Sequence, residues 1–443
     1  MPGLFFMPGT CPASRTGRRS GHAIPARIYA MQSIQQSHQP ALETLADATD
    51  TMRQQTTDLA SINSGSSNTE GVNAVADALA DLFSPIADSI ERVAVSPLHQ
   101  LADDGAFIDR PMGDALVIRK RPQAARRVLL AGHLDTVFPA DSSFQSVRVE
   151  ADRLHGPGVA DLKGGLVVMR HALEAFEQTP DADALGWTVV LNPDEEIGSM
   201  GSADLLDREA RAHDVGMIYE PSLPSGNLVA ARKGSGNFQI LVRGRAAHAG
   251  REHHLGRNAI RALADATVAI DDLNGQRPGV TVNVGQVVGG GPVNIVPDLA
   301  ILRLNVRLQQ PDDQAWVHEQ LTAIVEDVDD RDGIEASLHG RFTRPPKVRT
   351  PALESLIGEI STCRDLLGMD FAWEDTGGCC DGNNLAAAGL PNIDNLGVVG
   401  AHIHSHQEFM HIPSFVPRAQ LSALLLMRLA SGDAAWPERG QTP

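Results

Sequence analysis

The sequence has few cysteines, few aromatic residues and no long apolar run. Its 443 residues include 4 cysteines and no CxxC pair, which excludes a disulfide framework and favours a reducing, cytoplasmic compartment. No stretch of about 18 or more uncharged apolar residues occurs, so we expect no membrane-spanning helix. With 37 basic and 55 acidic residues, the formal charge of −18 argues against nucleic acid or an anionic membrane as a partner.

Acidic residues are also absent from residues 1–42, which contain Arg15, Arg18, Arg19 and Arg27 and are rich in Pro, Gly and Ser. The segment lacks the apolar core of a secretory signal. We interpret residues 1–42 as a disordered extension of unknown role, or as residues ahead of a true start at Met31. An Arg-rich transit peptide is the alternative. From residue 43 to 92 the pattern of apolar residues predicts helices.

Two apolar runs in the outer parts of the chain have the pattern of buried strands that end in polar residues. They are RRVLLAGHLDTV (126–137) and WTVVLN (187–192), and the run between them, GGLVVMRHALEAF (164–176), has the pattern of a helix. This order predicts an α/β domain with a mixed, mostly parallel sheet flanked by helices. We expect residues 43–232 and 344–443 to form it, with its chemistry at the carboxyl ends of the strands.

Residues 233–343 have a different pattern, because apolar and polar residues alternate along their strands. The runs GNFQILVRG, GVTVNVGQVV and DLAILRLNVRL alternate, with Val280, Val282, Val284 and Val288 expected on one face. Two segments between and after these strands have helical spacing. We therefore expect an inserted α+β domain, an antiparallel sheet plus two helices.

Histidines and carboxylates gather at the expected strand ends of the outer domain. Neutral imidazole mixed with carboxylates suits zinc or a similar divalent ion, and the lack of thiolates favours an open, hydrolytic site over a closed structural one. The residues are His133, Asp135, Asp161, Glu195, Glu196, Glu220 and His404.

Spacing suggests separate tasks for neighbouring residues in this set. Residues i and i+2 of a strand point the same way, so the Asp135 carboxylate can accept the second ring N–H of His133. Glu195 and Glu196 are adjacent, and two buried carboxylates repel each other unless a cation intervenes. If one binds a metal ion, its neighbour can act as general base on a water molecule bound to that ion.

Six motifs together resemble those of a known enzyme family. GHLDTV, GPGVADLKGG, DEEIGS, YEPS, RAAHAG and IHSHQEF occur in the order and approximate spacing of the co-catalytic zinc aminoacylase/carboxypeptidase family. That family includes glutamate carboxypeptidase, acetylornithine deacetylase and succinyl-diaminopimelate desuccinylase. The resemblance covers about residues 50 to 432.

The resemblance implies two Zn²⁺ per subunit, with Co²⁺ or Mn²⁺ as substitutes. Asp161 would bridge the two ions. His133 and Glu220 would complete one site, and Glu196 and His404 the other. A cis peptide bond is implied directly after Asp161.

The same resemblance implies roles for residues that do not bind metal. Glu195 would be the general base, and Asp135 the partner that orients His133. His248 would reach the active site of a partner subunit and stabilise the oxyanion, which implies a homodimer formed through residues 233–343.

For the substrate, the resemblance implies that Asn294 and Arg307 hold a carboxylate. Arg344 is a weaker candidate for the same task.

Two departures from the family pattern concern the substrate and one ligand. A stretch that often reads GG(T/S)D is GGCCDGN here, which places Cys379 and Cys380 beside the expected pocket. We interpret them as packing thiols, with a cysteine nucleophile as the alternative. His402 and His406 flank His404 at the same spacing, so the ligand assignment could shift by two residues.

These patterns predict a dizinc hydrolase that cleaves the amide bond of N-acyl amino acids or short peptides bearing a free carboxylate. The attacking group would be metal-bound hydroxide generated by Glu195. A carboxypeptidase and a deacylase cannot be separated by these motifs. The alternative from another class is a non-catalytic metal- or peptide-binding protein on the same scaffold.

Overall fold

The computed structural model describes residues 34–439. Most of the expected extension, residues 1–33, lies outside the described residues. The helix α1 (Gln39–Thr44) already buries Ala41 and Leu42, so the folded part of the chain includes the last residues of the range 1–42. Among the residues from 34 to 439, no helix is both long and apolar enough to cross a membrane.

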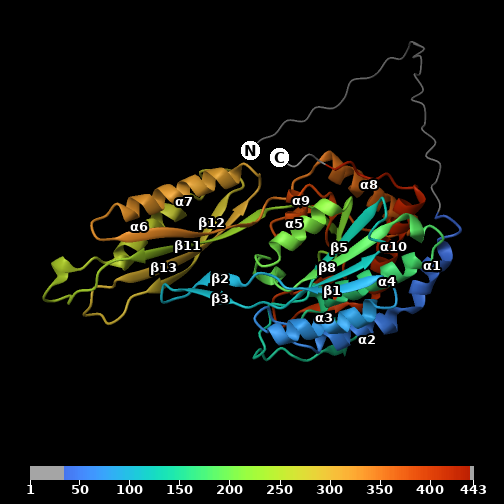
Figure 1. Cartoon of the computed structure of the whole chain (residues 1–443), viewed down its shortest axis with the longest axis horizontal. Helices are drawn as coiled ribbons and strands as arrows, with labels where there is room; N and C mark the ends of the chain where they lie inside the picture. The colour runs from blue at the N-terminus through green and yellow to red at the C-terminus, as the bar shows by residue number, and fades with distance from the viewer. Residues whose placement is uncertain (1–33, 440–443) are drawn as a thin grey trace, which may run out of the picture. The chain divides into compact units, whose positions relative to one another are not determined.

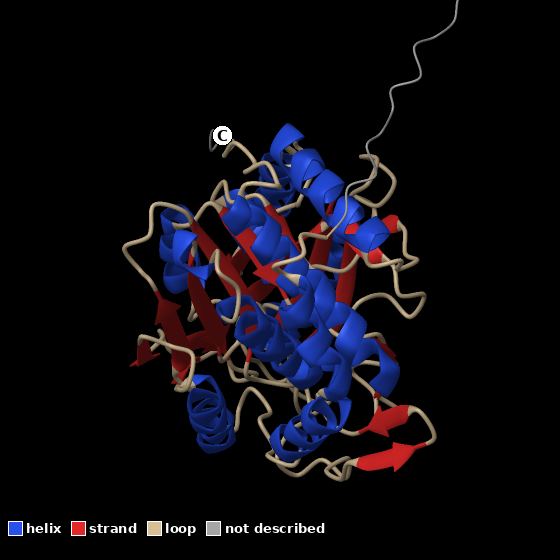
Figure 2. Cartoon of the chain, turned by 90° about the vertical axis from the view of Figure 1, so that its right-hand side faces the viewer, coloured by secondary structure: helices blue, strands red, loops and turns tan. Residues whose placement is uncertain are grey.

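A mixed sheet of six strands carries the strand ends that the sequence singled out (Figures 1 and 2). Its strand order is β1-β4-β8-β5-β9-β16. β8, β5, β9 and β16 run parallel to one another, and β4 and β1 are added at one edge, each antiparallel to its neighbour. The strands are β1 (Ser89–Val93), β4 (Ala115–Lys120), β5 (Arg127–His133), β8 (Gly186–Asn192), β9 (Val215–Ile218) and β16 (Asn392–Ile393).

Helices cover both faces of this sheet (Figure 2). Every residue of β8 is therefore buried, as its continuous apolar sequence requires. α5 (Ala203–Ala212) and α9 (Asp381–Ala387) share one apolar cluster with alternate strand residues. The other face packs on α4 (Gly164–Glu177), whose Leu166 lies against Gly132. α4 in turn packs against α10 (Phe415–Ser431).

The helical expectation for residues 43–92 holds over most of that range and is wrong at its end. α2 (Thr49–Ala60) and α3 (Thr69–Phe83) are helices, and Asn68 caps α3 by accepting a hydrogen bond from the backbone N–H of Gly71. Residues 89–93 instead form the edge strand β1. Its alternation of exposed and half-buried residues follows the two-residue period of a strand.

A second sheet of four strands is antiparallel throughout, as expected, with order β12-β13-β11-β14. Two helices, α6 and α7, lie on the same side of it and close one apolar core (Figure 1). That this segment is a separate domain with boundaries 233 and 343 stays a prediction. The elements are β11 (Gly234–Arg243), α6 (Ala259–Asp271), β12 (Thr281–Gly289), β13 (Leu299–Leu308), α7 (Asp313–Asp329) and β14 (Glu335–Arg344).

The expected valine face of β12 is broken by a bulge. The register shifts between Val284 and Gln286, so Val284 pairs with Leu304, whereas Val288 pairs with Ile301 on the opposite face. Placing Val288 on the face of Val282 and Val284 was therefore wrong. The extra residue is Gly285, and a bulge reverses the facing of every later side chain.

A hairpin that the sequence analysis did not identify covers part of the free face of this sheet. It consists of β2 (Leu98–Leu101) and β3 (Phe107–Arg110). Leu101 packs against Leu241 and Ile301, which explains why Ile301 is buried although it lies on the side away from α6 and α7.

Smaller pieces complete the surroundings of the site. β10 (Leu228–Arg232) pairs with β15 (Trp373–Thr376), and α8 (Pro351–Leu366) precedes β15. Four short strands form a further sheet that holds the loop after β17. In strand order they are β17 (Gly400–Ala401), β18 (Phe409–His411), β7 (Arg153–His155) and β6 (Arg148–Glu150).

Candidate metal centre

The carboxyl ends of three neighbouring strands bring the expected ligands together. His133 is the last residue of β5, and Glu220 follows β9 by two residues. Glu195 and Glu196 lie in a single helical turn just after β8. Because β5, β8 and β9 run parallel, these side chains meet at one edge of the sheet.

Asp161 lies between the two histidines that were expected on different metal ions. It occupies the turn Val159–Lys163 that leads into α4, and its peptide bond to Leu162 is cis, as the resemblance implies. Oδ1 of Asp161 lies 3.2 Å from Nε2 of His133, and Oδ2 lies 3.1 Å from Nε2 of His404. One carboxylate therefore faces two imidazoles, one with each oxygen.

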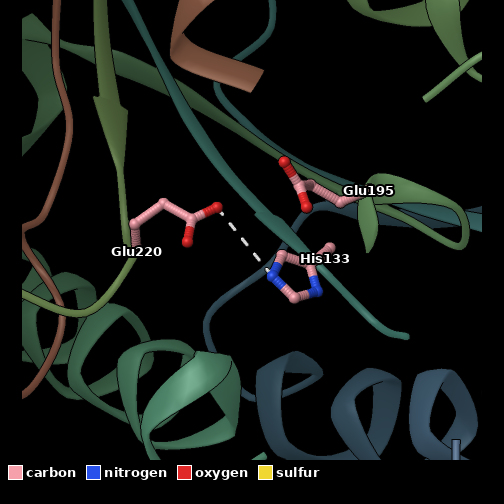
Figure 3. Close-up of side chains that lie close together, drawn as sticks. All are labelled: His133, Glu195 and Glu220. Carbon is pink, nitrogen blue, oxygen red and sulfur yellow. Dashed lines mark ion pairs between the residues drawn. The ribbon is translucent and has the colours of Figure 1, made fainter. Parts of the chain in front are cut away.

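The remaining carboxylates complete this arrangement. Oε1 of Glu220 is 3.9 Å from Nε2 of His133, and Figure 3 shows Glu195 and Glu220 directed toward that imidazole from different sides. Oε2 of Glu196 is 3.1 Å from Nε2 of His404. Ligand atoms of two triplets lie within 4.8 Å of one another: His133 with Glu195 and Glu220, and His133 with Asp161 and Glu196.

The electrostatics of this cluster fit a divalent cation. Burial raises the pKa of Glu196 to about 8, and it raises the pKa of Glu220 well above the usual range, in both cases with the Asp161 charge as a further cause. Hydrogen bonds to Asp161 and Glu196 raise the pKa of His404 to about 11. A bound divalent cation would relieve the repulsion between these buried carboxylates. The donor set of carboxylate oxygens and imidazole nitrogens also suits zinc.

Asp135 supports the cluster in a way that its spacing only partly predicted. Nδ1 of His133 lies 3.0 Å from the backbone oxygen of Asp135 and 3.4 Å from its Oδ1, so the main-chain oxygen is the nearer acceptor. The carboxylate instead accepts the backbone N–H groups of Glu195 at 3.1 Å and Glu196 at 3.2 Å, and the hydroxyl of Ser66 at 2.7 Å. Asp135 therefore positions the turn that carries both glutamates.

Glu408 is a supporting residue to which the sequence analysis gave no role. Its buried carboxylate accepts backbone N–H groups from Gly158, Ala160 and Asp161 at 2.9–3.1 Å, which fixes the turn around Asp161. The signal was present, since Glu408 stands four residues after His404 in the quoted motif. What the sequence did not reveal is that its partner is a turn almost 250 residues earlier.

Of the three alternating histidines, His404 is the one directed at Asp161 and Glu196. His406 stacks on Phe144 with ring centroids 5.5 Å apart, and His402 lies 5.8 Å from the ring of Phe409.

A cavity of about 290 Å³ opens beside the cluster. Its lining includes Asp161, Glu195, Glu196, Glu220 and His404 of the cluster, together with Cys379 and Cys380. Cys379 is half-buried, and its Sγ accepts a hydrogen bond from Nη1 of Arg307 at 3.0 Å. Cys380 is buried and caps α9 through its own Sγ. Arg307 thus contacts a residue that lines the cavity.

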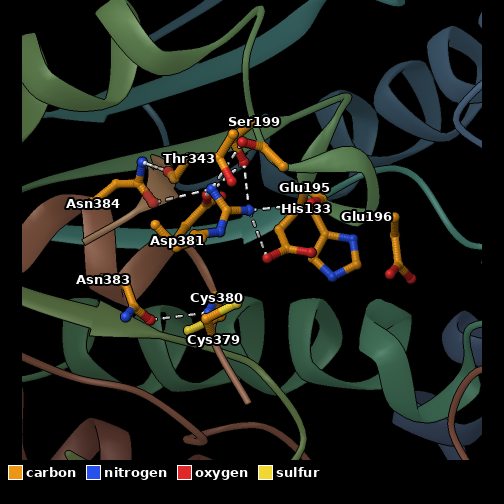
Figure 4. Close-up of polar contacts among 12 residues, drawn as sticks. His133, Glu195, Glu196, Ser199, Thr343, Cys379, Cys380, Asp381, Asn383 and Asn384 are labelled. Carbon is orange, nitrogen blue, oxygen red and sulfur yellow. Dashed lines mark hydrogen bonds and ion pairs between the residues drawn. The ribbon is translucent and has the colours of Figure 1, made fainter. Parts of the chain in front are cut away.

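Arg344 does not suit the weaker role considered for it, that of a substrate-carboxylate binder. It is buried, and its guanidinium already donates to Glu195, Gly198, Ser199 and Asn384. Figure 4 shows Glu195, Ser199, Asp381 and Asn384 gathered around the same point. The sequence around Arg344, an arginine followed by two prolines, does not show that its guanidinium is buried among these acceptors.

His248 and Asn294 lie together, and apart from Arg307. The backbone N–H of Ala249 donates to the oxygen of Asn294, and both Asn294 and His248 are exposed. Asn294 precedes the start of β13 at Leu299, whereas Arg307 stands near its end. An extended strand rises about 3.3 Å per residue, so Leu299 and Arg307 are about 26 Å apart along β13.

Comparison with known proteins identifies the family of the chain. The model of peptidase family M20/M25/M40 matches residues 129–428. Carboxypeptidase G2 from Pseudomonas sp. (strain RS-16) is 29% identical over 330 residues, covering 72% of this chain and 78% of that protein. Succinyl-diaminopimelate desuccinylase from Nitrosococcus oceani is 27% identical over 308 residues, covering 65% and 80%.

Solved structures show the same fold at lower identity. A tripeptidase from Staphylococcus aureus has a TM-score of 0.67 and 22% identity, covering 87% of this chain and 99% of its own. A dinuclear metal binding peptidase of Bacillus subtilis from the M20 family has a TM-score of 0.61 and 14% identity, covering 86% and 98%.

The family match and the carboxylate–histidine cluster at the strand ends define a metal-dependent hydrolase. The chain belongs to peptidase family M20/M25/M40.

Proposed function

We propose that the protein is a dizinc hydrolase that cleaves the amide bond of N-acyl amino acids or short peptides with a free carboxylate. The observation that carries the proposal is the placement of Asp161, whose two oxygens face the imidazoles of His133 and His404. A carboxylate placed in this way is suited to bridge two ions.

The proposed ligands divide into two sets that share Asp161. His133 and Glu220 would hold one ion, and Glu196 and His404 the other. When bound, the ions supply Lewis acidity, which polarises a carbonyl group and lowers the pKa of water to about 7.

Glu195 performs the proton transfers in this proposal. It lines the cavity beside the proposed ligands, and burial raises its pKa, while the nearby Arg344 charge opposes that rise. A carboxylate of raised basicity accepts a proton from the attacking water and then delivers it to the leaving amine. Arg307 binds the substrate carboxylate, because a guanidinium can donate two parallel hydrogen bonds to it.

A homodimer is part of the proposal, because His248 lies at the far end of β13 from the cavity. Arg307 contacts Cys379 of the cavity wall, whereas His248 and Asn294 belong to the other end of that strand. Within one chain Leu299 and Arg307 are about 26 Å apart along that strand, so His248 would reach a cavity only in a partner subunit. There it would donate a hydrogen bond to the developing oxyanion.

The surface near His248 has features of an interface between subunits. β12 is an edge strand of its sheet and offers unpaired backbone groups. Three large apolar side chains are exposed in the neighbouring loops: Leu255, Val293 and Ile295. Clustered exposed apolar side chains are typical of surfaces that bind another protein.

The cytoplasmic location suggested by cysteine usage likewise stays a prediction.

The proposal is tested by measuring amine release from a panel of N-acyl amino acids and dipeptides. The protein is first chelated, then assayed with and without zinc, cobalt or manganese. We expect hydrolysis only with added metal and only for substrates with a free carboxylate; the amide of the best substrate serves as the matched control. Bound zinc without turnover across the panel would support the non-catalytic alternative instead.

A further inference from the structure

Arg344 connects the antiparallel sheet to the proposed general base. It is the last residue of β14, it is 2 % exposed, and its Nη2 lies 2.8 Å from Oε1 of Glu195. The same Nη2 also lies 3.1 Å from the backbone oxygen of Glu195. A single guanidinium nitrogen therefore contacts both the side chain and the main chain of this glutamate.

The other partners of Arg344 fix the guanidinium itself. Nη1 lies 3.0 Å from Oδ1 of Asp381 and 3.0 Å from Oδ1 of Asn384, two residues in the first turn of α9. Nη2 also donates to Oγ of Ser199 at 2.8 Å. A planar guanidinium with all these acceptors has one available orientation. Figure 4 shows Ser199, Asp381, Asn384 and Glu195 converging on this place.

The backbone around Arg344 is held by the same helix. The side-chain amide of Asn384 donates to the backbone oxygen of Thr343 at 2.9 Å, and that of Asn383 donates to the oxygen of Pro345 at 2.7 Å. The position of Arg344 is thus determined by α9 on one side and by the end of β14 on the other.

We propose that Arg344 is a positioning residue for Glu195, binding one of its carboxylate oxygens so that the carboxylate faces the water that attacks the substrate. This inference rests on the proposed role of Glu195 as general base. Geometry supports it, because Glu195 contacts Arg344 through Oε1 while a carboxylate oxygen of the same residue lies within 4.8 Å of ligand atoms of His133 and Glu220.

Two other roles for a buried arginine are less consistent with these contacts. A substrate-binding arginine needs free donors toward the cavity, whereas Nη1 and Nη2 of Arg344 already donate within the protein and Arg344 does not line the cavity. A purely structural arginine need not contact Glu195 at all, since Asp381 alone would neutralise its charge. An ion pair with arginine lowers the basicity of Glu195, which catalysis requires. A contact made only for stability would therefore be better placed on another carboxylate.

The experiment compares kcat and KM for wild type, Arg344→Lys and Arg344→Met, each with and without the additional substitution Glu195→Gln. Where Glu195 is intact, we expect Arg344→Met to lower kcat about 100-fold, the scale of a misplaced catalytic group, with KM changed less than about threefold. Combined with Glu195→Gln, Arg344→Met should change kcat less than about threefold, since the group on which Arg344 acts is gone. Zinc content should equal that of wild type.

Arg121→Met is the matched control. Arg121 also forms a largely buried ion pair, with Glu177, but it hydrogen-bonds the oxygen of Leu185 at the opposite end of β8 from the site. This variant should keep the kcat of wild type. Arg344→Lys keeps the positive charge but lacks the planar guanidinium with its several N–H donors. Its kcat should lie between those of wild type and Arg344→Met. This variant supplies the test if Arg344→Met does not fold.

An equal loss of kcat from Arg344→Met with and without Glu195→Gln, or a rise in KM at unchanged kcat, would overturn the inference. The first result would indicate a structural role, and the second a substrate-binding role. Failure of the proposed function is a separate result, because the wild-type protein itself would then show no metal-dependent turnover.

Discussion

Asp161 directs Oδ2 at Nε2 of His404, 3.1 Å away, although 243 residues separate them in the sequence. Its other oxygen is 3.2 Å from Nε2 of His133. The contact with His404 depends on an unusual backbone, since His404 has φ of 61° in the left-handed region that few residues other than glycine adopt. Such conformations are retained where the surroundings require them and are concentrated at functional sites. The relationship between these two residues carries the interpretation of the site as a place for two metal ions.

Glu195 and Glu196 should differ sharply when each is changed to glutamine. Glu195→Gln removes the proposed proton acceptor, so we expect kcat to fall by about 10²–10⁴-fold with zinc content unchanged. Glu196→Gln removes a proposed ligand, so we expect it to lose zinc as well as activity. Steady-state kinetics and elemental analysis of the same samples measure both effects. Loss of zinc from Glu195→Gln would show that the roles of the two neighbours are exchanged.

Mixing two inactive variants should restore activity if His248 acts in a partner subunit. Glu195→Gln and His248→Ala each disable a site, but a mixed dimer has one site with an intact Glu195 and a partner with an intact His248. Random assortment of equal amounts should recover about a quarter of wild-type activity. The control is each variant taken alone through the same refolding or subunit-exchange procedure. Activity that stays at the sum of the two variants would contradict the arrangement between subunits.

Cys379 should be the cysteine whose modification blocks the enzyme. It is half-buried and lines the cavity beside Glu195, whereas Cys363 and Cys380 are buried. Burial also raises the pKa of Cys363 to about 12 and that of Cys380 well above the usual range, which keeps both thiols protonated and unreactive.

The measurement is loss of activity on maleimide labelling in a Cys11→Ser background, since Cys11 lies outside the described residues. Labelling should inactivate this protein and be slowed by substrate. The additional substitution Cys379→Ser should make it resistant. Full activity after stoichiometric labelling of Cys379 would show that the thiol does not face the substrate.

His171 should make the fold sensitive to acid. Its Nε2 lies 2.9 Å from Oε1 of Gln55, and burial, together with the nearby charge of Arg170, lowers its pKa to about 4 despite the opposing carboxylate of Glu174. The unfolded chain binds this proton near pH 6.5, so between pH 6.5 and 4 the unfolded state holds a proton that the folded state does not. Stability is therefore lost as the pH falls through this window.

Denaturant unfolding of zinc-free protein at about pH 7.5 and about pH 5 measures this effect. For His171→Gln, the loss of unfolding free energy between the two pH values should be smaller than for wild type by about 2 kcal/mol. His318→Gln, on the exposed face of α7, is the control and should behave like wild type. Equal losses in all three proteins would contradict the account of His171.

The strand-end residues could be predicted because the buried strands of an α/β sheet are recognisable by composition. β5 and β8 are continuous apolar runs, and the polar residues that follow them must lie at the same edge if the strands are parallel. Contacts between loops could not be predicted in this way. Glu408 and Arg344 reach their partners through the docking of turns and of α9, which no periodicity in their own segments records.

Two features of the antiparallel part illustrate the same limit. Gly285 within β12 is the kind of residue that signals a bulge, but the direction in which later side chains turn depends on pairing with β13. The hairpin β2–β3 had a local signal that was not used, the Asp-Gly pair at residues 104–105 between two short strands. Its packing on Leu241 and Ile301 is a long-range contact.

The most direct test of the central claim is anomalous diffraction at the zinc edge from crystals of the zinc-loaded protein. The account predicts two peaks, one on each side of the Asp161 carboxylate. The peak next to Oδ1 should have His133 and Glu220 as neighbours, and the peak next to Oδ2 should have Glu196 and His404. A single peak, or a peak in contact with Glu195 and not with Asp161, would contradict both the bridging carboxylate and the assignment of Glu195 as the general base.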